Sequence, residues 1–464
     1  MIDFSALLRA DTGQPARLIH IVDAASFDAW LTAQPERHRV AVTVQRFAGK
    51  PGEFAILPGD QADEWSALAA VANADILSTW CLAKCAETLP EGSYRLANEQ
   101  QPAAAALGWL AAQYRFDRYR KDEDGVGPRV LATNDVARIE SILRMAEALA
   151  LVRDMVNTPT ADMGPPDIEA IAVEIATKHH AKLTVTRGDE LASGYPMIHA
   201  VGRAADRAFA PRLIEMTWGK PSHPHIAIIG KGVCFDSGGL DIKPSSGMRL
   251  MKKDMGGGAH ALALASLIMA NRLPVHLHLL VPAVENAISG NAFRPGDVLA
   301  SRRGLSVEIG NTDAEGRLIL GDALTRAAED KPELILDFAT LTGAARVALG
   351  PDLPALFAND DALADALGQA AQQTDDPLWR LPLWAGYADM LKSDVADITN
   401  SGDSGFAGAI SAALFLQKFV PDGVAWAHFD TFAWRPTAKP GRPKGGDALG
   451  LRAAFAMLQA RYAR

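Results

Sequence analysis

From about residue 156 onward, apolar runs typical of β-strands alternate with helical patterns, and no other feature restricts the fold as strongly. The strand-like runs are KLTVTRG, PRLIEMTWG, HIAIIGKGVCF, VHLHLLVPAV, LSVEIG, ELILDFATL and VAWAHFD. The run IAII at residues 226–229 is continuously apolar, as in a strand that is buried on both faces. Strands and helices in alternation predict an α/β fold, in which helices cover a central sheet.

The sequence before this region divides into a small domain and a connecting helix. Residues 1–132 are predicted to form a small α/β domain, with strand-like runs ARLIHIVD and RVAVTVQRF and helix-like runs WSALAAVAN and QPAAAALGWLAAQYRF. Residues 133–156 are predicted to form a long amphipathic helix, with Asn134 or Asp135 as its N-cap and Pro159 beyond its end. The second domain is predicted to cover residues 157–464, and a chain of 464 residues has room for two or more domains.

Composition argues against several functional classes. Apolar residues make up 48% of the chain, which is enough for sizeable cores and too many for a disordered protein. The net charge of −9 argues against a broad nucleic-acid surface, which needs clustered Lys and Arg. The N-terminus lacks the basic start of a secretory signal. The sequence contains no run of about 18 apolar residues, so no membrane span is predicted. Three cysteines give no disulfide framework, so the sequence predicts a cytoplasmic protein.

A glycine-rich segment after the IAII run brings charged residues to one end of a buried strand. These residues are Lys231, Asp236, Lys243 and Asp254, within GKGVCFDSGGLDIKPSSGMRLMKKDMGGGA. Glycine lets the backbone approach a ligand closely, and open α/β sheets hold their sites at the carboxyl ends of strands. A surface loop with ordinary salt bridges is the plainer interpretation. A phosphate loop is disfavoured, because the pattern G-x-x-x-x-G-K followed by Ser or Thr is absent and the acids would repel phosphate.

The octapeptide NTDAEGRL, residues 311–318, ends a strand-like run and opens a helix-like one. Asp313 and Glu315 lie two positions apart, so in an extended backbone both carboxylates point to the same side. With Asp236 and Asp254 they would place four negative charges in one cleft, where they repel strongly unless cations bind. Two divalent ions would balance them, as in dimetal hydrolases. Lys231 could be a ligand only as a neutral amine and otherwise stays a cation, and the residues alone leave both options open.

Two rival sites have weaker support. His276 and His278 lie on one face of the strand VHLHLLVP, but the further His and Asp of a barrel hydrolase do not follow at later strand ends. Packing on the sheet face or at an interface is the alternative. Ser237 precedes two glycines, but it lacks a G-x-S-x-G elbow and a matching His–Asp pair.

These motifs resemble those of the cytosolic leucine aminopeptidase family of dimetal exopeptidases. NTDAEGRL is similar to the hallmark of that family, and GKGVCFDSGGLDIKP, MKKDMGGGA and ATLTGA are similar to its other core motifs, in the same order. The similarity covers nearly all of residues 150–430. The resemblance implies a small N-terminal α/β domain and a larger catalytic domain with a mixed, mainly parallel central sheet between helices. It also implies short peptide substrates and a homohexamer whose active sites face an inner cavity.

The resemblance assigns roles to individual residues. The metal ligands would be Lys231, Asp236, Asp254, Asp313 and Glu315, holding two Mn²⁺ or Zn²⁺ ions, with Co²⁺ and Mg²⁺ as further options. Asp236 and Glu315 would bridge the ions, Lys231 and Asp254 would complete one site, and Asp313 the other. Lys243 would be the catalytic lysine, and Arg317 would hold a bicarbonate ion that acts as general base. Met251, Asn311, Thr340 and Gly343 would line the pocket for the first side chain, and the backbone of Leu341 would contact the substrate.

Two segments depart from the family pattern. Where relatives have a DIAGTAW-like segment, this chain has the shorter DTFAW at Asp430–Trp434, with the bulky Phe432. Where they have GATGFGVR, it has GGDALGLR at Gly445–Arg452. The first segment helps to wall the side-chain pocket in relatives, so the preferred N-terminal residue is left open. Two alternatives to a general aminopeptidase are the same dimetal site specialised for a narrow dipeptide substrate, and a non-catalytic regulatory hexamer.

Overall fold

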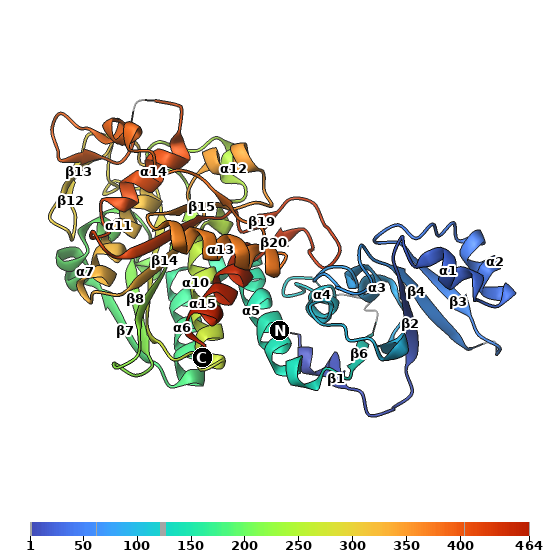
Figure 1. Cartoon of the computed structure of the whole chain (residues 1–464). Coiled ribbons are helices and arrows are strands. Elements are labelled where there is room, and N and C mark those ends of the chain that lie inside the picture. Colours follow the sequence, from blue (N-terminus) through green and yellow to red (C-terminus); the bar gives the residue numbers. More distant parts are fainter. Residues whose placement is uncertain (1, 62, 121–126, 403, 464) are drawn as a thin grey trace. The chain divides into compact units, whose positions relative to one another are not determined.

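The structure, a computed structural model, describes residues 2–61, 63–120, 127–402 and 404–463 and shows two compact units (Figure 1). One unit comprises Met1–Ala150 and Thr437–Lys444, and the other comprises Leu151–Pro436 and Gly445–Arg464. The segment Thr437–Lys444 lies within the range predicted for the second domain and groups with the first unit. Helix α5 (Ile139–Asn157) runs through the boundary between the units. A small α/β unit and a larger one with a mixed sheet confirm the predicted fold class.

A sheet with the strand order β1-β6-β5-β2-β4-β3 forms the first unit. Its strands are β1 (Leu8–Ala10), β2 (Arg17–Val22), β3 (Phe54–Pro58), β4 (Trp65–Ala70), β5 (Gly92–Leu96) and β6 (Arg129–Thr133). Neighbouring strands pair in parallel, except that β3 and β4 are antiparallel. Its helices are α1 (Phe27–Thr32), α2 (Glu36–Val44), α3 (Ala83–Thr88) and α4 (Ala105–Ala111).

Two predictions for this unit are wrong. The run WSALAA, predicted as helix, is strand β4, whose last four residues are buried. The run RVAVTV, predicted as strand, lies in helix α2, where Val42 is buried while Val40 and Val44 are exposed. Alternating β-branched residues favour a strand locally, but α2 packs one face against β3, and such tertiary contacts override local propensity.

The central sheet of the larger unit has the order β16-β15-β18-β14-β9-β11-β8-β7, with β10 also pairing with β11. Its strands are β7 (Lys182–Arg187), β8 (Arg212–Trp218), β9 (His225–Gly230), β10 (Gly232–Asp236), β11 (His276–Asn286), β14 (Leu334–Ala339), β15 (Ala355–Ala358), β16 (Trp379–Arg380) and β18 (Ala425–Asp430). Strands β18, β14, β9 and β11 pair in parallel, whereas β7, β8 and β15 join through antiparallel pairs. The sheet is therefore mixed and mainly parallel at its centre.

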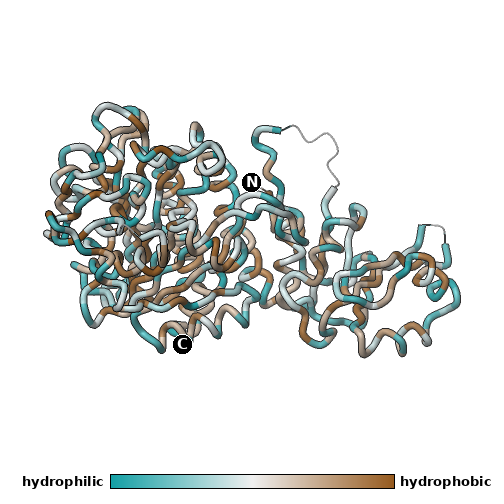
Figure 2. Tube along the Cα trace, turned by 90° about the horizontal axis from the view of Figure 1, so that it is seen from above, coloured by the Kyte–Doolittle hydropathy of each residue, from teal (hydrophilic) through white to brown (hydrophobic). Residues whose placement is uncertain are grey.

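Smaller elements complete the larger unit. Short strands are β12 (Val298–Ala300), β13 (Ser306–Glu308), β17 (Ile398–Thr399), β19 (Trp434–Arg435) and β20 (Gly445–Gly446). The helices are α6 (Pro165–His179), α7 (Gly188–Gly194), α8 (Pro196–Gly202), α9 (Ser245–Met248), α10 (Gly256–Ala270), α11 (Glu315–Glu329), α12 (Gly343–Leu349), α13 (Asp361–Gln373), α14 (Gly408–Gln417) and α15 (Leu451–Tyr462). Figure 2 shows that the hydrophilic stretches lie mainly in outer loops. Among the described residues, no helix has the length and apolarity needed to cross a membrane.

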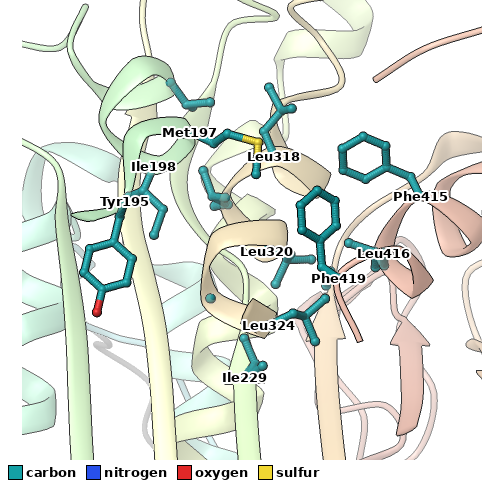
Figure 3. Close-up of a cluster of buried hydrophobic side chains, with 14 of the residues drawn as sticks. Tyr195, Met197, Ile198, Ile229, Leu318, Leu320, Leu324, Phe415, Leu416 and Phe419 are labelled. Atoms are coloured by element: carbon teal, nitrogen blue, oxygen red, sulfur yellow. The ribbon is translucent and has the colours of Figure 1, made fainter. Parts of the chain in front are cut away.

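Helices cover both faces of the central sheet. In β9, Ala227 and Ile229 belong to the same apolar cluster as Leu324 of α11 (Figure 3). Their neighbours Ile226 and Ile228 point to the opposite face, where α10 packs against β9 and β14. All residues of the IAII run are fully buried, so it is a strand buried on both faces, as predicted.

Helix α10 begins with three glycines that let it lie close against the sheet. A Cβ atom on Gly257 would overlap the backbone carbonyl of Phe338 in β14. Any larger residue would therefore push the helix away from the sheet. This close approach sets the start of α10, and Asp254 just before it, near the carboxyl end of β9.

A buried charged pair joins two neighbouring strands. Asp337 of β14 lies opposite His428 of β18, and His428 Nδ1 is 2.5 Å from Asp337 Oδ1. Trp426 Nε1 donates to the other carboxylate oxygen at 2.7 Å. Burial favours the neutral imidazole, but the charge of Asp337 and its hydrogen bond outweigh burial and raise the pKa of His428.

The raised pKa of His428 predicts a pH-dependent stability. Below about pH 6.5, the usual pKa of unfolded histidine, the ring is protonated in both states and the ion pair contributes fully to the free energy of unfolding. This contribution is lost as the pH rises through the raised folded-state pKa. We therefore expect the urea-unfolding midpoint of the wild-type protein to decrease between about pH 6 and pH 9, and that of His428→Gln to decrease less. An unchanged slope in the variant would contradict the assignment.

Candidate metal centre

Charged residues from separate segments meet beyond the carboxyl ends of the central strands. Lys231 follows β9, and Asp236 ends β10. Asp254 lies in the turn before α10, Glu315 is the first residue of α11, and Asp313 stands two positions earlier. The fold brings together the five ligands that the resemblance implies, at the edge of the sheet where α/β proteins place their sites.

Three carboxylates form a tight group within this centre. Asp236, Asp313 and Glu315 each offer one oxygen, and these oxygens lie within 4.8 Å of one another. Asp236 and Glu315 are only 3% and 1% exposed, so water screens their charges weakly. Oxygens so arranged suit a divalent ion such as Mg²⁺, Mn²⁺ or Zn²⁺.

Lys231 is enclosed by carboxylates. Its Nζ lies 2.7 Å from Asp254 Oδ2 and 2.9 Å from Glu315 Oε1. Burial alone would lower the pKa of this ammonium, but the charges of Asp254, Glu315 and Asp236 outweigh burial and raise it. Lys231 is therefore a cation in these contacts. It would have to give up a proton to become the neutral ligand that the resemblance implies.

Lys243 approaches the same group from a more open side. Its Nζ lies 2.8 Å from Asp236 Oδ2, and it also pairs with Asp313. The side chain is 14% exposed, compared with 3% for Lys231. Burial opposes its charge, but the carboxylates of Asp236 and Asp313 raise the pKa of Lys243. The centre therefore holds a fixed positive charge on its accessible side.

Several carboxylate oxygens here have no hydrogen-bond donor in the part of the chain that the structure describes. They are Asp254 Oδ2, Asp313 Oδ1 and Glu315 Oε1, and all three are buried. Lysine nitrogens come close to them without hydrogen-bond geometry. Burial, and next the charge of Asp236, raise the pKa of Glu315 to about 8 and that of Asp313 to about 6. A bound cation would pair with the oxygens that lack a donor and would stabilise the charged form of these carboxylates. These residues therefore fit a metal.

An asparagine that sequence reasoning missed positions Asp236. Asn286, the last residue of β11, is fully buried, and its Nδ2 donates to Asp236 Oδ1 at 2.9 Å and to the carbonyl of Thr312 at 3.1 Å. It thereby ties β11 to the NTDAEGRL segment. The signal in the sequence is small, because Asn286 is one of two polar residues that follow the apolar run VPAV.

The loop after β14 carries residues next to the ligands. Thr340 Oγ1 donates to Asp254 Oδ1 at 2.8 Å. Asp430, at the end of β18, accepts from the amides of Leu341 and Thr342 at 3.0 and 3.2 Å and from the Thr342 hydroxyl at 2.6 Å. Asp430 therefore fixes the loop that holds two of the residues predicted to meet the substrate.

Arg317 lies in the first turn of α11, two positions after Glu315. Its Nη1 donates to the carbonyl of Asn400 at 2.7 Å, whereas its buried Nε has no partner among the described residues. Burial lowers the pKa of Arg317 to about 10, so the group remains a cation at neutral pH. A cation with a buried, unused donor can hold an anion.

The other residues predicted for the side-chain pocket come from three segments. Met251 opens the turn that carries Asp254, Asn311 Oδ1 accepts from the amide of Asp313 at 2.7 Å, and Gly343 begins α12. A cavity next to Asp254 is lined by Thr340, but its lining does not include these three residues. Of the predicted side-chain pocket residues, Thr340 alone lines this cavity, and the prediction for the other three stays a prediction.

The histidines of the rival site lie at the other end of the sheet. His276 begins β11, and its ring lies 4.8 Å from that of His225, at the start of β9. His278 Nε2 lies 3.0 Å from Glu215 Oε1. Within the described ranges, these side chains form no group with metal-ligand spacing. They pack against the sheet, as the alternative interpretation has it.

Comparison with known proteins identifies close relatives. Residues 150–455 match the catalytic domain of the cytosol aminopeptidase family, and residues 18–131 match the N-terminal domain of M17 aminopeptidases. A probable cytosol aminopeptidase of Syntrophotalea carbinolica is 40% identical over 369 residues, which cover 76% of this chain and 73% of that protein.

Solved structures extend the similarity to the whole fold. The cytosol aminopeptidase of Coxiella burnetii superposes with a TM-score of 0.93 at 44% identity, over 98% of this chain and 99% of the other. The bottromycin maturation enzyme BotP in complex with Mn gives 0.83 at 31% identity, over 96% of this chain and 100% of BotP.

Removal of the Asn286 side chain tests the construction of this centre. We expect Asn286→Ala to weaken Mn²⁺ binding about 10- to 100-fold, the usual effect of losing a group that orients a metal ligand. Competition with a fluorescent chelator measures the affinity. Asn291→Ala, at an exposed position after the same strand, is the control. Equal affinities in the two variants would show that Asn286 does not orient a metal ligand.

Proposed function

This chain belongs to the cytosol aminopeptidase family and is a peptidase, and we propose that it removes N-terminal residues from short peptides at a two-metal centre. The observation that carries the proposal is the group of Asp236, Asp313 and Glu315, whose oxygens lie within 4.8 Å of one another. The family indicates the type of reaction, and this group offers a place for it.

The ligands of the proposed centre follow the resemblance. Two divalent ions would be held by the residues that the resemblance implies, which are Lys231, Asp236, Asp254, Asp313 and Glu315. When bound, Mn²⁺ or Zn²⁺ would polarise the scissile carbonyl and lower the pKa of a water molecule. Carboxylate oxygens with one amine also suit Co²⁺ and Mg²⁺. Because the similar BotP was solved with Mn, Mn²⁺ is the first ion to test.

Lys243 is proposed to stabilise the oxyanion of the tetrahedral intermediate. Its ammonium is fixed by Asp236 at 2.8 Å and remains partly open to solvent. A positive charge held where the carbonyl oxygen becomes negative binds the transition state more tightly than the substrate. Such a charge accelerates the chemical step rather than substrate binding alone.

Arg317 is proposed to hold a bicarbonate ion that serves as general base. The guanidinium itself cannot accept a proton at neutral pH, because it stays charged. Its buried Nε has no partner among the described residues, and its planar fork matches a planar oxyanion. Arg317 would thus hold a proton acceptor at the first turn of α11, which also carries Glu315.

A free α-amino group is proposed as the feature that defines substrates, since an acylated amine would lose its contact with the centre. In line with the resemblance, we also propose a cytoplasmic homohexamer that admits short peptides. The non-catalytic alternative is weaker, because Lys243 and the implied ligands are all present and meet at one place.

The first test compares aminoacyl p-nitroanilides with their N-acetylated twins. After chelation we expect neither set to be cleaved, and after reloading with Mn²⁺ or Zn²⁺ we expect release of nitroaniline from the free-amine set alone. The reason is that only a free amine can contact the centre. Equal cleavage of both sets would remove the amine contact, and cleavage without metal would remove the two-metal centre.

Lys243→Met separates the role of the lysine in catalysis from a role in assembly. We expect kcat to fall about 100- to 1,000-fold, as when an oxyanion donor is lost, while metal content by atomic emission stays at the wild-type amount. Lys252→Met is the matched control, because the Lys252 ammonium donates instead to the carbonyl of Asn157. Loss of metal from the Lys243 variant would mean that the lysine assembles the site.

A further inference from the structure

A narrow cavity adjoins the metal centre, and the proposed reaction leaves its charged walls unused. We call it the Phe432 slot, and its lining includes Lys253, Thr340, Thr342, Arg346, Asp430 and Phe432. Thr340 belongs to both places, since its hydroxyl donates to Asp254 Oδ1 at 2.8 Å. A peptide at the centre would therefore have the slot within reach of its first side chain.

Two cations lie close to the same aromatic ring in the slot. Lys253 Nζ is 5.7 Å from the ring centroid of Phe432, and the guanidinium carbon of Arg346 is 4.5 Å from it. Lys253 is 3% exposed, and its Nζ donates to Asp254 Oδ1 at 3.0 Å. Arg346 has the aromatic ring as its partner and no carboxylate at ion-pair distance among the described residues. A ring attracts a cation more weakly than a carboxylate does.

Asp430 does not supply the carboxylate that Arg346 lacks. Its two oxygens accept hydrogen bonds from the Leu341 amide and from the amide and hydroxyl of Thr342. The lining therefore carries two cations and one carboxylate that is already engaged. Asp254, the partner of Lys253, also belongs to the metal centre. An additional anion would complete the pairing in the slot.

The slot is too small for a side chain to enter unless its walls move. Its enclosed space is about 10 Å³, which holds about one water-sized group. Phe432 takes up the room, in a segment that is shorter than its counterpart in the family pattern. Any first side chain would therefore have to displace the Phe432 ring, and a carboxylate would gain an ion pair with Lys253 and Arg346 in return, whereas an isobutyl group would not.

We infer that the Phe432 slot selects peptides whose first residue is acidic, with the carboxylate of Asp or Glu bound by Lys253 and Arg346. This inference rests on the proposed aminopeptidase function and names the substrate class of that site. Arg346 can bind a carboxylate through two parallel N–H···O bonds. A neutral amide of the same shape leaves the cations without a counter-charge.

The anilides of Glu and Gln differ in charge and hardly in shape, so they test the inference directly. We expect kcat/KM of the Mn-loaded enzyme to be about tenfold or more higher for Glu than for Gln, and higher for Glu than for Leu. Arg346→Met and Lys253→Met should each bring the Glu/Gln ratio close to one, and Arg346→Lys should keep part of it. Lys252→Met, which changes the neighbouring lysine, should keep the wild-type ratio.

Product binding gives a readout that does not depend on turnover. We expect L-glutamate to raise the melting temperature of the Mn-loaded protein more than L-glutamine, and Arg346→Met to abolish the difference. If the enzyme cleaves Leu and Gln anilides without preferring Glu, the selectivity is overturned and the aminopeptidase function stands. If it cleaves no anilide, tighter glutamate binding still supports the slot, and equal binding overturns it. Stabilisation by bicarbonate alone that depends on Arg346 would also overturn it, since the slot would then hold a free anion.

Discussion

Mutual repulsion among buried carboxylates is the constraint on which the rest of this structure depends. The acidic side chains of the metal centre converge where water screens their charges weakly, and each additional one raises the cost of ionising its neighbours. Lys231 and Lys243 offset this cost, because each lies at ion-pair distance from two carboxylates. In the proposed enzyme, divalent ions would neutralise part of the carboxylate charge. Lys231 would then be available as a metal ligand, and Lys243 would be available to stabilise the oxyanion.

The scaffold keeps these charges together against their repulsion. Strand β9 is buried on both faces, and Gly257 allows α10 to press against β14, so the segments before α10 and after β9 cannot drift apart. Asn286 adds a tie across the centre, from β11 to Asp236 and to the NTDAEGRL segment. These restraints come from buried backbone and packed side chains rather than from exposed loops. Such support holds a catalytic group at a fixed geometry.

The convergence of the charged residues of the candidate centre could be predicted because they are concentrated in short motifs. Asp313 and Glu315 lie two positions apart, so local spacing alone indicates a shared side. Asn286 and Arg346 could not be predicted, because each acts on a residue far away in the sequence. The two wrong predictions in the first unit have the same physical cause. The alternation in RVAVTV reflects only local sequence, and the run WSALAA becomes the buried strand β4 because of the strands on either side of it.

The proposed metal centre and the Phe432 slot share one carboxylate, that of Asp254. Asp254 Oδ2 forms an ion pair with Lys231, while its Oδ1 accepts hydrogen bonds from Lys253 and Thr340. A cation on Asp254 would draw charge from Oδ1 and weaken its hold on Lys253, so the slot would become more positive when the centre is loaded. An acidic side chain would then bind more tightly to the loaded enzyme than to protein stripped of metal. By linkage, the acidic peptide would raise the affinity for metal by the same factor.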